Sequence, residues 1–142
     1  YHYRIHDASV CHRYSDNMDV QRIMLAETLN PIVKRMNQEL AEKLGDPSYC
    51  RLWHDYERYL FGVVTEVLYL KFYHKDNPNK RERRKEAIRF LRTEPFYTII
   101  REMPYATLST VAKIKKFLIQ HGFVVLFHLM HRHLLKLFST AR

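Results

Sequence analysis

The residues with the clearest chemical potential are the cations and bulky apolar side chains of the last thirty positions. Lys113, Lys115 and Lys116 precede a run of aromatic and aliphatic residues, Arg132 and Lys136 follow it, and the stretch contains no Asp or Glu. Helices of this composition bind anionic membrane surfaces, where each cation near the surface contributes about 1 kcal/mol. Packing of the same apolar side chains against other helices accounts for the composition equally well, so both interpretations stay open.

Patterns typical of catalysis or metal binding are missing from the sequence. There is no DxD, HExxH or GxSxG. His128 and His131 share one face of a predicted helix, whereas His133 points away and no carboxylate or cysteine is near. We therefore predict no metal site and expect these imidazoles to form the polar side of an amphipathic helix. Cys11 and Cys50 lack metal-binding spacing and are predicted to be free thiols.

A second cationic cluster occupies residues 80–85, with the sequence KRERRK. Such a run is a candidate for binding phosphates. A solvated helix face explains it better, because Glu82 and Glu86 can pair with neighbouring cations. No helix-turn-helix or RNP pattern accompanies the run. Nucleic-acid binding is therefore the less favoured interpretation.

The charge of the chain is divided unevenly between its halves. The net charge is +9 over 142 residues, made up of −2 for residues 1–70 and +11 for residues 71–142. A split of this kind indicates a docking face for an anionic partner. The longest apolar run, at 122–130, is far shorter than the roughly 20 residues that span a membrane. We expect contact with a membrane surface, if any, to be peripheral.

Composition predicts a mainly α-helical fold. Three glycines and five prolines are too few for a sandwich or barrel, and a hydrophobic share of 46% excludes disorder. We expect about five packed amphipathic helices in a domain at 15–142, preceded by a short extended strand and turn at 1–14. The first predicted helix begins at 15–17 and ends at Gly45, and the next two cover 48–75 and 80–93. A helical turn at 96–103 follows. The last two predicted helices are one capped by Thr107 or Ser109 and one at 123–138.

Two stretches resemble a known family. The opening YHYRIHDASV resembles the Y-x-Y-R-x-x-x-x-S-(I/V) segment that ends the GT-A catalytic domain of bacterial family 2 glycosyltransferases. The stretch LSTVAKIKKF, at 108–117, looks like the basic, apolar helix near the end of the helical region that follows this domain. The motifs are ten residues each, but their order and separation bracket the whole chain.

The resemblance implies that the chain is part of a longer enzyme. That parent would transfer a sugar from a nucleotide-sugar donor to a surface-polysaccharide acceptor, such as capsule, at the cytoplasmic face of the cell membrane. Its Mg or Mn site, formed by a DxD, and its acidic base would precede residue 1, so this chain alone should be inactive and bind no cofactor. By position in the family, Arg4 would neutralise the donor diphosphate and His6 would lie near the metal or leaving group.

The helices would then pack on the enzyme's own N-terminal catalytic domain and support acceptor and membrane docking through Lys113, Lys115, Lys116, Arg132 and Lys136. Without that domain, the uncovered apolar surface is expected to favour a homodimer. The alternative function is a stand-alone basic helical module that binds nucleic acid or a protein.

Overall fold

The computed structural model of the chain describes the backbone of residues 14–140 and the side chains of residues 14–134. These residues form six α-helices, which confirms the prediction of a mainly helical fold. The predicted strand and turn cover residues 1–14, and residues 1–13 lie outside the described part of the chain. The helices are α1 (Met18–Leu44), α2 (Arg51–Val67), α3 (Arg83–Leu91), α4 (Phe96–Glu102), α5 (Thr110–Gln120) and α6 (Val124–Thr140).

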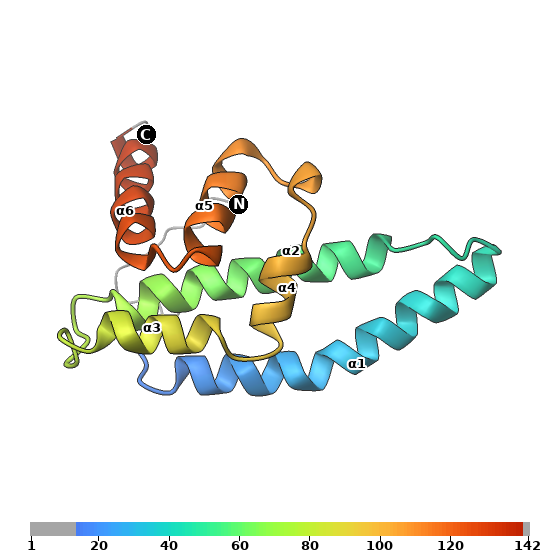
Figure 1. The fold of residues 1–142 in the computed structure, drawn as a ribbon, viewed down its shortest axis with the longest axis horizontal. Helices are drawn as coiled ribbons and strands as arrows, with labels where there is room; N and C mark the ends of the chain where they lie inside the picture. The colour runs from blue at the N-terminus through green and yellow to red at the C-terminus, as the bar shows by residue number, and fades with distance from the viewer. Residues whose placement is uncertain (1–13, 141–142) are drawn as a thin grey trace, which may run out of the picture.

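The two longest helices, α1 and α2, form an antiparallel hairpin (Figure 1). Gly45 ends α1 as predicted, because its φ of 63° is left-handed and its N–H donates to the carbonyl of Glu42 at 3.1 Å. Pro31 lies inside α1, which continues past it. The shorter helices gather on one half of the hairpin, and the other half projects beyond them (Figure 1).

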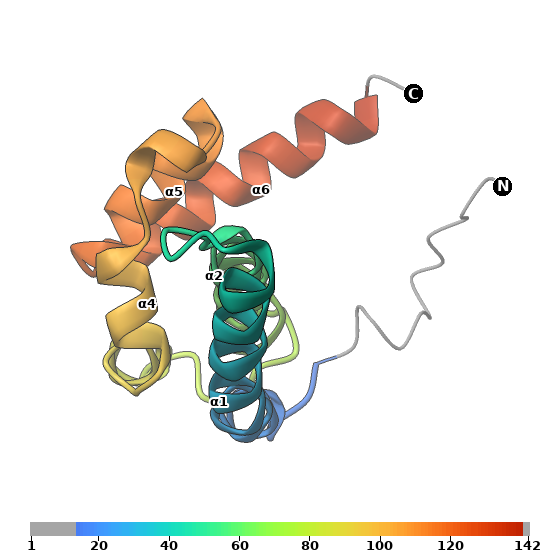
Figure 2. The ribbon, with the colours of Figure 1, turned by 90° about the vertical axis from the view of Figure 1, so that its right-hand side faces the viewer.

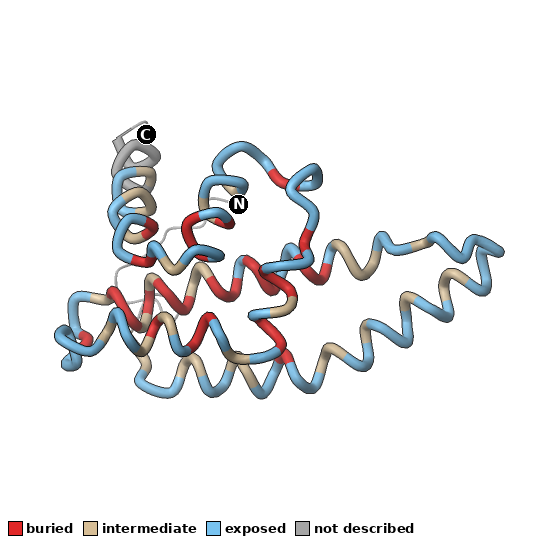
Figure 3. Tube along the Cα trace, in the orientation of Figure 1, coloured by how far each residue is buried: buried red, intermediate tan, exposed pale blue. Residues whose placement is uncertain are grey.

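The core forms along α2, on the apolar stripe predicted for that helix. Its buried members include Leu60, Val64 and Val67. Figure 3 shows the buried residues concentrated where α2 meets the shorter helices, whereas the projecting half of the hairpin has mostly exposed residues. In α1 only Ala26 is buried. Ile23, Leu29 and Val33 of α1 are partly buried and pack against the same core, so α1 covers α2 together with the shorter helices.

A π-helical segment, η2 (Leu68–Phe72), continues α2 where the sequence predicted regular helix up to residue 75. The buried side chain of Asn77 donates to the carbonyls of Lys71 at 3.1 Å and Phe72 at 3.0 Å. These bonds satisfy carbonyls that lack a partner at a helix end. The segment leaves Tyr69 and Tyr73 both against the ring of His128 in α6.

The last two helices pack across the hairpin on the side away from its projecting end (Figures 1 and 2). A short 3-10 turn, η3 (Tyr105–Thr107), leads into α5, and a turn with Gly122 at φ 70° leads from α5 to α6. Within the described part of the chain, no helix combines the length and the apolar character needed to cross a bilayer.

Candidate anion-binding surfaces

Helices α5 and α6 present large apolar side chains to solvent, as α1 also does at Val20, Met24 and Met36. Ser109 caps α5 by accepting a hydrogen bond from the N–H of Ala112 at 3.4 Å, which selects between the two caps predicted. The remaining sides of α5 and α6 carry large apolar residues that are roughly half exposed. We call these residues the α5–α6 surface: Val111, Ile114, Phe117, Phe123, Val125, Leu126 and Leu129.

The three lysines predicted for docking lie in different environments. Lys113 is exposed on α5, Lys115 is half-buried, and Lys116 is only 1% exposed. Nζ of Lys116 donates to the Met103 carbonyl at 2.7 Å and lies 4.0 Å from the centre of the Tyr105 ring. Burial lowers the pKa of both Lys115 and Lys116. Lys116 is therefore an interior residue in this structure, and we leave it out of the α5–α6 surface.

The other predicted site residues fall at the ends of the chain. Arg132 is exposed on α6, on the same side as Leu129 in helical register. The backbone of Lys136 belongs to α6, but its side chain lies outside the described part of the structure. Arg4 and His6 lie outside it altogether. Lys113 and Arg132 are thus the predicted cations that the described structure places beside exposed apolar residues.

A groove between α3, α4 and the α5–α6 turn gathers basic side chains, of which only Arg84 belongs to a cluster noted in the sequence. Its volume is about 520 Å³. Three guanidinium groups and an imidazole line it, together with apolar and aromatic side chains: Arg84, Ile88, Leu91, Arg92, Tyr97, Ile100, Arg101, Ile119, Gln120, His121, Gly122 and Phe123. No carboxylate is among these lining residues. We call this cavity the basic groove.

The guanidinium of Arg101 is held at the wall of the basic groove by an aromatic neighbour. It donates to the Tyr97 hydroxyl at 3.1 Å and lies 5.4 Å from the centre of the same ring. Glu94, just before α4, accepts a hydrogen bond from the Thr98 hydroxyl at 3.0 Å. Within the described residues, Arg84, Arg92 and Arg101 make no ion pair with a carboxylate.

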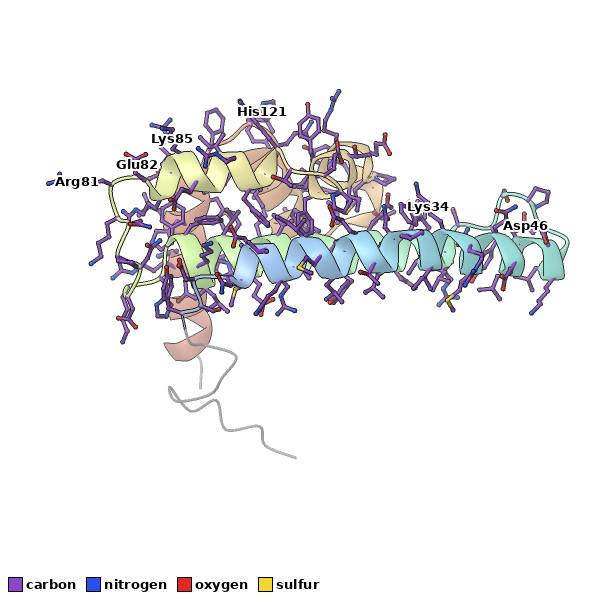
Figure 4. All side chains as sticks on the ribbon, turned by 90° about the horizontal axis from the view of Figure 1, so that it is seen from below. Lys34, Asp46, Arg81, Glu82, Lys85 and His121 are labelled. Atoms are coloured by element: carbon purple, nitrogen blue, oxygen red, sulfur yellow. The ribbon has the colours of Figure 1, made fainter. Side chains whose placement is uncertain are left out.

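The predicted cationic run at 80–85 contributes one residue, Arg84, to the basic groove. Arg83 instead turns inward, with its guanidinium 5.0 Å from the centre of the Tyr73 ring, whereas Lys80, Arg81 and Lys85 are exposed. Lys85 lies 3.8 Å from the carboxylate of Glu82, as a solvated helix face predicts. Figure 4 shows Arg81, Glu82, Lys85 and His121 on one edge of the molecule, so α3 joins the run to the groove.

The prediction that the α6 histidines form its polar side is wrong for two of the three. The ring of His128 stacks on Tyr73 with 4.6 Å between centroids, and that of His131 meets Tyr69 at 4.9 Å. Burial lowers the pKa of His131 to about 4 and also lowers that of His128. Only His133 is exposed. Among the described residues, no three metal-ligating side chains come together.

A relay of side chains at the start of α2 was also missed by the sequence analysis. Sγ of Cys50 lies 3.1 Å from Nε2 of His54, and Nδ1 of His54 lies 2.9 Å from a carboxylate oxygen of Glu57. The other oxygen of this buried carboxylate accepts from the Trp53 indole at 3.0 Å. An N–H at Nδ1 that donates to Glu57 leaves the Nε2 lone pair facing the thiol. The spacing i, i+4, i+7 on one helix is the signal that could have revealed this relay.

The relay predicts that Cys50 reacts faster than an unassisted exposed thiol. Because the thiolate is the nucleophile, removal of the acceptor in His54→Asn should slow alkylation of Cys50 about tenfold near pH 7. Mass spectrometry of peptides after timed exposure to iodoacetamide measures the rate at this residue alone. Glu57→Gln, which keeps the shape but weakens the orienting bond, should give an intermediate rate. Equal rates in all three proteins would contradict the prediction.

Comparison of the chain with protein-family models, with curated proteins and with solved structures finds no match.

Proposed function

We propose that this chain is the C-terminal helical part of a family 2 glycosyltransferase, and that its α5–α6 surface docks the enzyme on an anionic membrane. The parent would transfer a sugar from a nucleotide-sugar donor to a surface-polysaccharide acceptor at the inner face of the cell membrane. The observation that carries the docking role is the exposure of seven large apolar side chains on α5, α6 and the turn between them, without a carboxylate. The opening YHYRIHDASV supports the family assignment.

Physical chemistry favours a membrane as the occupant of the α5–α6 surface. Phe117, with 48% of its surface exposed, lies beside Phe123, with 6.4 Å between the ring centroids. Such apolar patches on a soluble domain usually mark an interaction site. Lys113 and Arg132 add positive charge at its border, which suits anionic lipid headgroups better than an apolar protein core.

The other elements of the proposal concern the intact enzyme. The catalytic domain that would precede this chain is its expected partner, and its DxD would hold Mg or Mn. Arg4 and His6 would then lie on the donor side of the cleft, with Arg4 neutralising diphosphate charge. Activity is expected only from the full-length protein.

Co-sedimentation with vesicles tests the docking role. We expect binding to phosphatidylglycerol-containing vesicles at about 50 mM salt and weaker binding at about 500 mM, because salt screens the cationic border. The double variant Phe117→Ser with Leu126→Ser should bind about tenfold more weakly or worse, because two groups that enter the acyl boundary are lost. Both side chains are exposed, so the fold should persist.

The matched control is Met36→Ser, which removes an exposed apolar side chain from α1. It should leave vesicle binding unchanged. The docking role is refuted if the unmodified chain stays in the supernatant at low salt, or if Met36→Ser weakens binding as much as the double variant. Light scattering without vesicles tests the homodimer: a dimer that the double variant converts to monomer would show that a second copy occupies the surface instead.

A further inference from the structure

The basic groove brings together basic side chains from three separate parts of the chain. Arg84 and Arg92 come from α3 and its end, Arg101 from α4, and His121 from the turn after α5. Planar guanidinium groups bind phosphate oxygens through paired N–H donors, and several of them around one cavity favour a multiply charged anion. The absence of a carboxylate among the lining residues leaves this charge uncompensated within the groove.

The floor of the basic groove is apolar. Leu91, Ile100 and Ile119 line it and are almost completely buried. A low-dielectric floor strengthens the field of the cations at the rim, because less water screens it. The volume of about 520 Å³ is within the range typical of small-molecule sites. The groove therefore suits a phosphate group attached to a less polar moiety.

The basic groove shares an edge with the α5–α6 surface. Phe123 belongs to both, and its ring lies 6.1 Å from that of His121, which also lines the groove. The His121 ring in turn lies 4.5 Å from Phe117 of the α5–α6 surface. A lipid at the edge of that surface would thus have its headgroup beside the groove.

We infer that the basic groove binds a phosphomonoester or diphosphate group, and that a lipid headgroup presents it. The class of ligand follows from the three guanidinium groups and the apolar floor. The lipid source rests on the proposed membrane docking, whereas the phosphate chemistry does not. Arg101 is the best-positioned donor because Tyr97 fixes its guanidinium at the wall.

Calorimetric titration with inorganic pyrophosphate tests the phosphate chemistry without a membrane. We expect one site per chain, with affinity reduced about tenfold by Arg92→Gln and by Arg101→Gln, because each removes charge-assisted hydrogen bonds. Arg35→Gln is the matched control. Arg35 is an exposed arginine of α1, 3.8 Å from the carboxylate of Glu39, and it does not line the groove. Its loss should leave pyrophosphate affinity unchanged.

Vesicles of equal charge, containing either phosphatidic acid or phosphatidylglycerol, test whether a lipid headgroup presents the phosphate group. The unmodified chain should prefer phosphatidic acid, whose phosphate is a monoester, and Arg101→Gln should abolish that preference. If pyrophosphate does not bind, the groove inference is overturned even where vesicle binding through the α5–α6 surface persists. Pyrophosphate binding without a lipid preference overturns the lipid source and indicates a soluble phosphorylated ligand. Tighter binding of a single-stranded oligonucleotide, with the same sensitivity to Arg92→Gln, overturns the inference in favour of nucleic acid.

Discussion

Replacement of Phe96 by alanine is expected to lower the free energy of unfolding by about 3–5 kcal/mol. The side chain of Phe96 is completely buried at the start of α4. Its ring lies 5.1 Å from that of Phe90 in α3, which lies 5.8 Å from that of Phe72 in η2. Truncation would leave a cavity at the point where these three elements meet, and close packing allows only partial collapse around it.

Urea denaturation followed by circular dichroism measures this loss. Phe117→Ala is the matched control, since it makes the same chemical change at a side chain that is half exposed. That control should alter stability by no more than about 0.5 kcal/mol. Vesicle binding should show the reverse order, with the larger loss in Phe117→Ala. Similar stabilities for the two variants would contradict the assignment of Phe96 to the core.

The elements predicted best from sequence are those with strong local signals. The stripe of α2 recurs at three- and four-residue intervals, and such periodicity specifies both the helix and its buried face. Gly45 ends α1 because only glycine readily adopts the left-handed conformation found there. The π-helical segment at 68–72 has no such signal. Its carbonyls are satisfied by Asn77, from a loop whose position depends on the tertiary fold.

The basic groove could not be predicted because its basic side chains are separated in sequence. Arg84, Arg101 and His121 approach one another only when α3, α4 and the α5–α6 turn pack together. The excess of positive charge in the second half of the chain indicated an anionic partner but not a cavity. Similarly, the sequence placed Lys113 and Lys116 in one cluster, although three residues on a helix were enough to bury one and expose the other.

The histidines of α6 were misplaced for a related reason. The helix carries apolar residues on most of its circumference, so periodicity does not select its buried face. Packing against η2 decides the face, and the aromatic rings of Tyr69 and Tyr73 receive the imidazoles there. Aromatic contact offsets the loss of hydration for a neutral imidazole, whereas a charged one would lose more.

Acidification is expected to destabilise the fold through His131. Burial lowers its pKa from 6.5 to about 4, and the charges of Lys115 and His128 act in the same direction. Arg83 and Arg132 likewise lower the pKa of His128, so the groups that face this pair are cationic. Within the described residues, the buried Nδ1 atoms of both rings have no hydrogen-bond acceptor, and a proton there would be left without a partner.

The sign follows from proton uptake. Between pH 6.5 and about 4, His131 binds a proton in the unfolded chain but not in the folded one, so the free energy of unfolding falls as the pH decreases. The lowering of the His131 pKa from 6.5 to about 4 corresponds to about 3 kcal/mol. Solvent screening at this partly exposed ring reduces the expected loss in the free energy of unfolding to about 1–2 kcal/mol. Above pH 6.5 this contribution should be complete and constant.

Urea midpoints measured from about pH 7 down to about pH 4 test this prediction in three proteins. His131→Phe keeps a ring against Tyr69 and removes the titrating group, so its stability should fall less steeply with acid. His133→Phe changes the exposed histidine of the same helix and should retain the steep fall. Carboxylates titrate equally in all three, and the difference between the curves therefore isolates His131. Parallel curves for the unmodified chain and His131→Phe would show that this imidazole does not control the acid sensitivity.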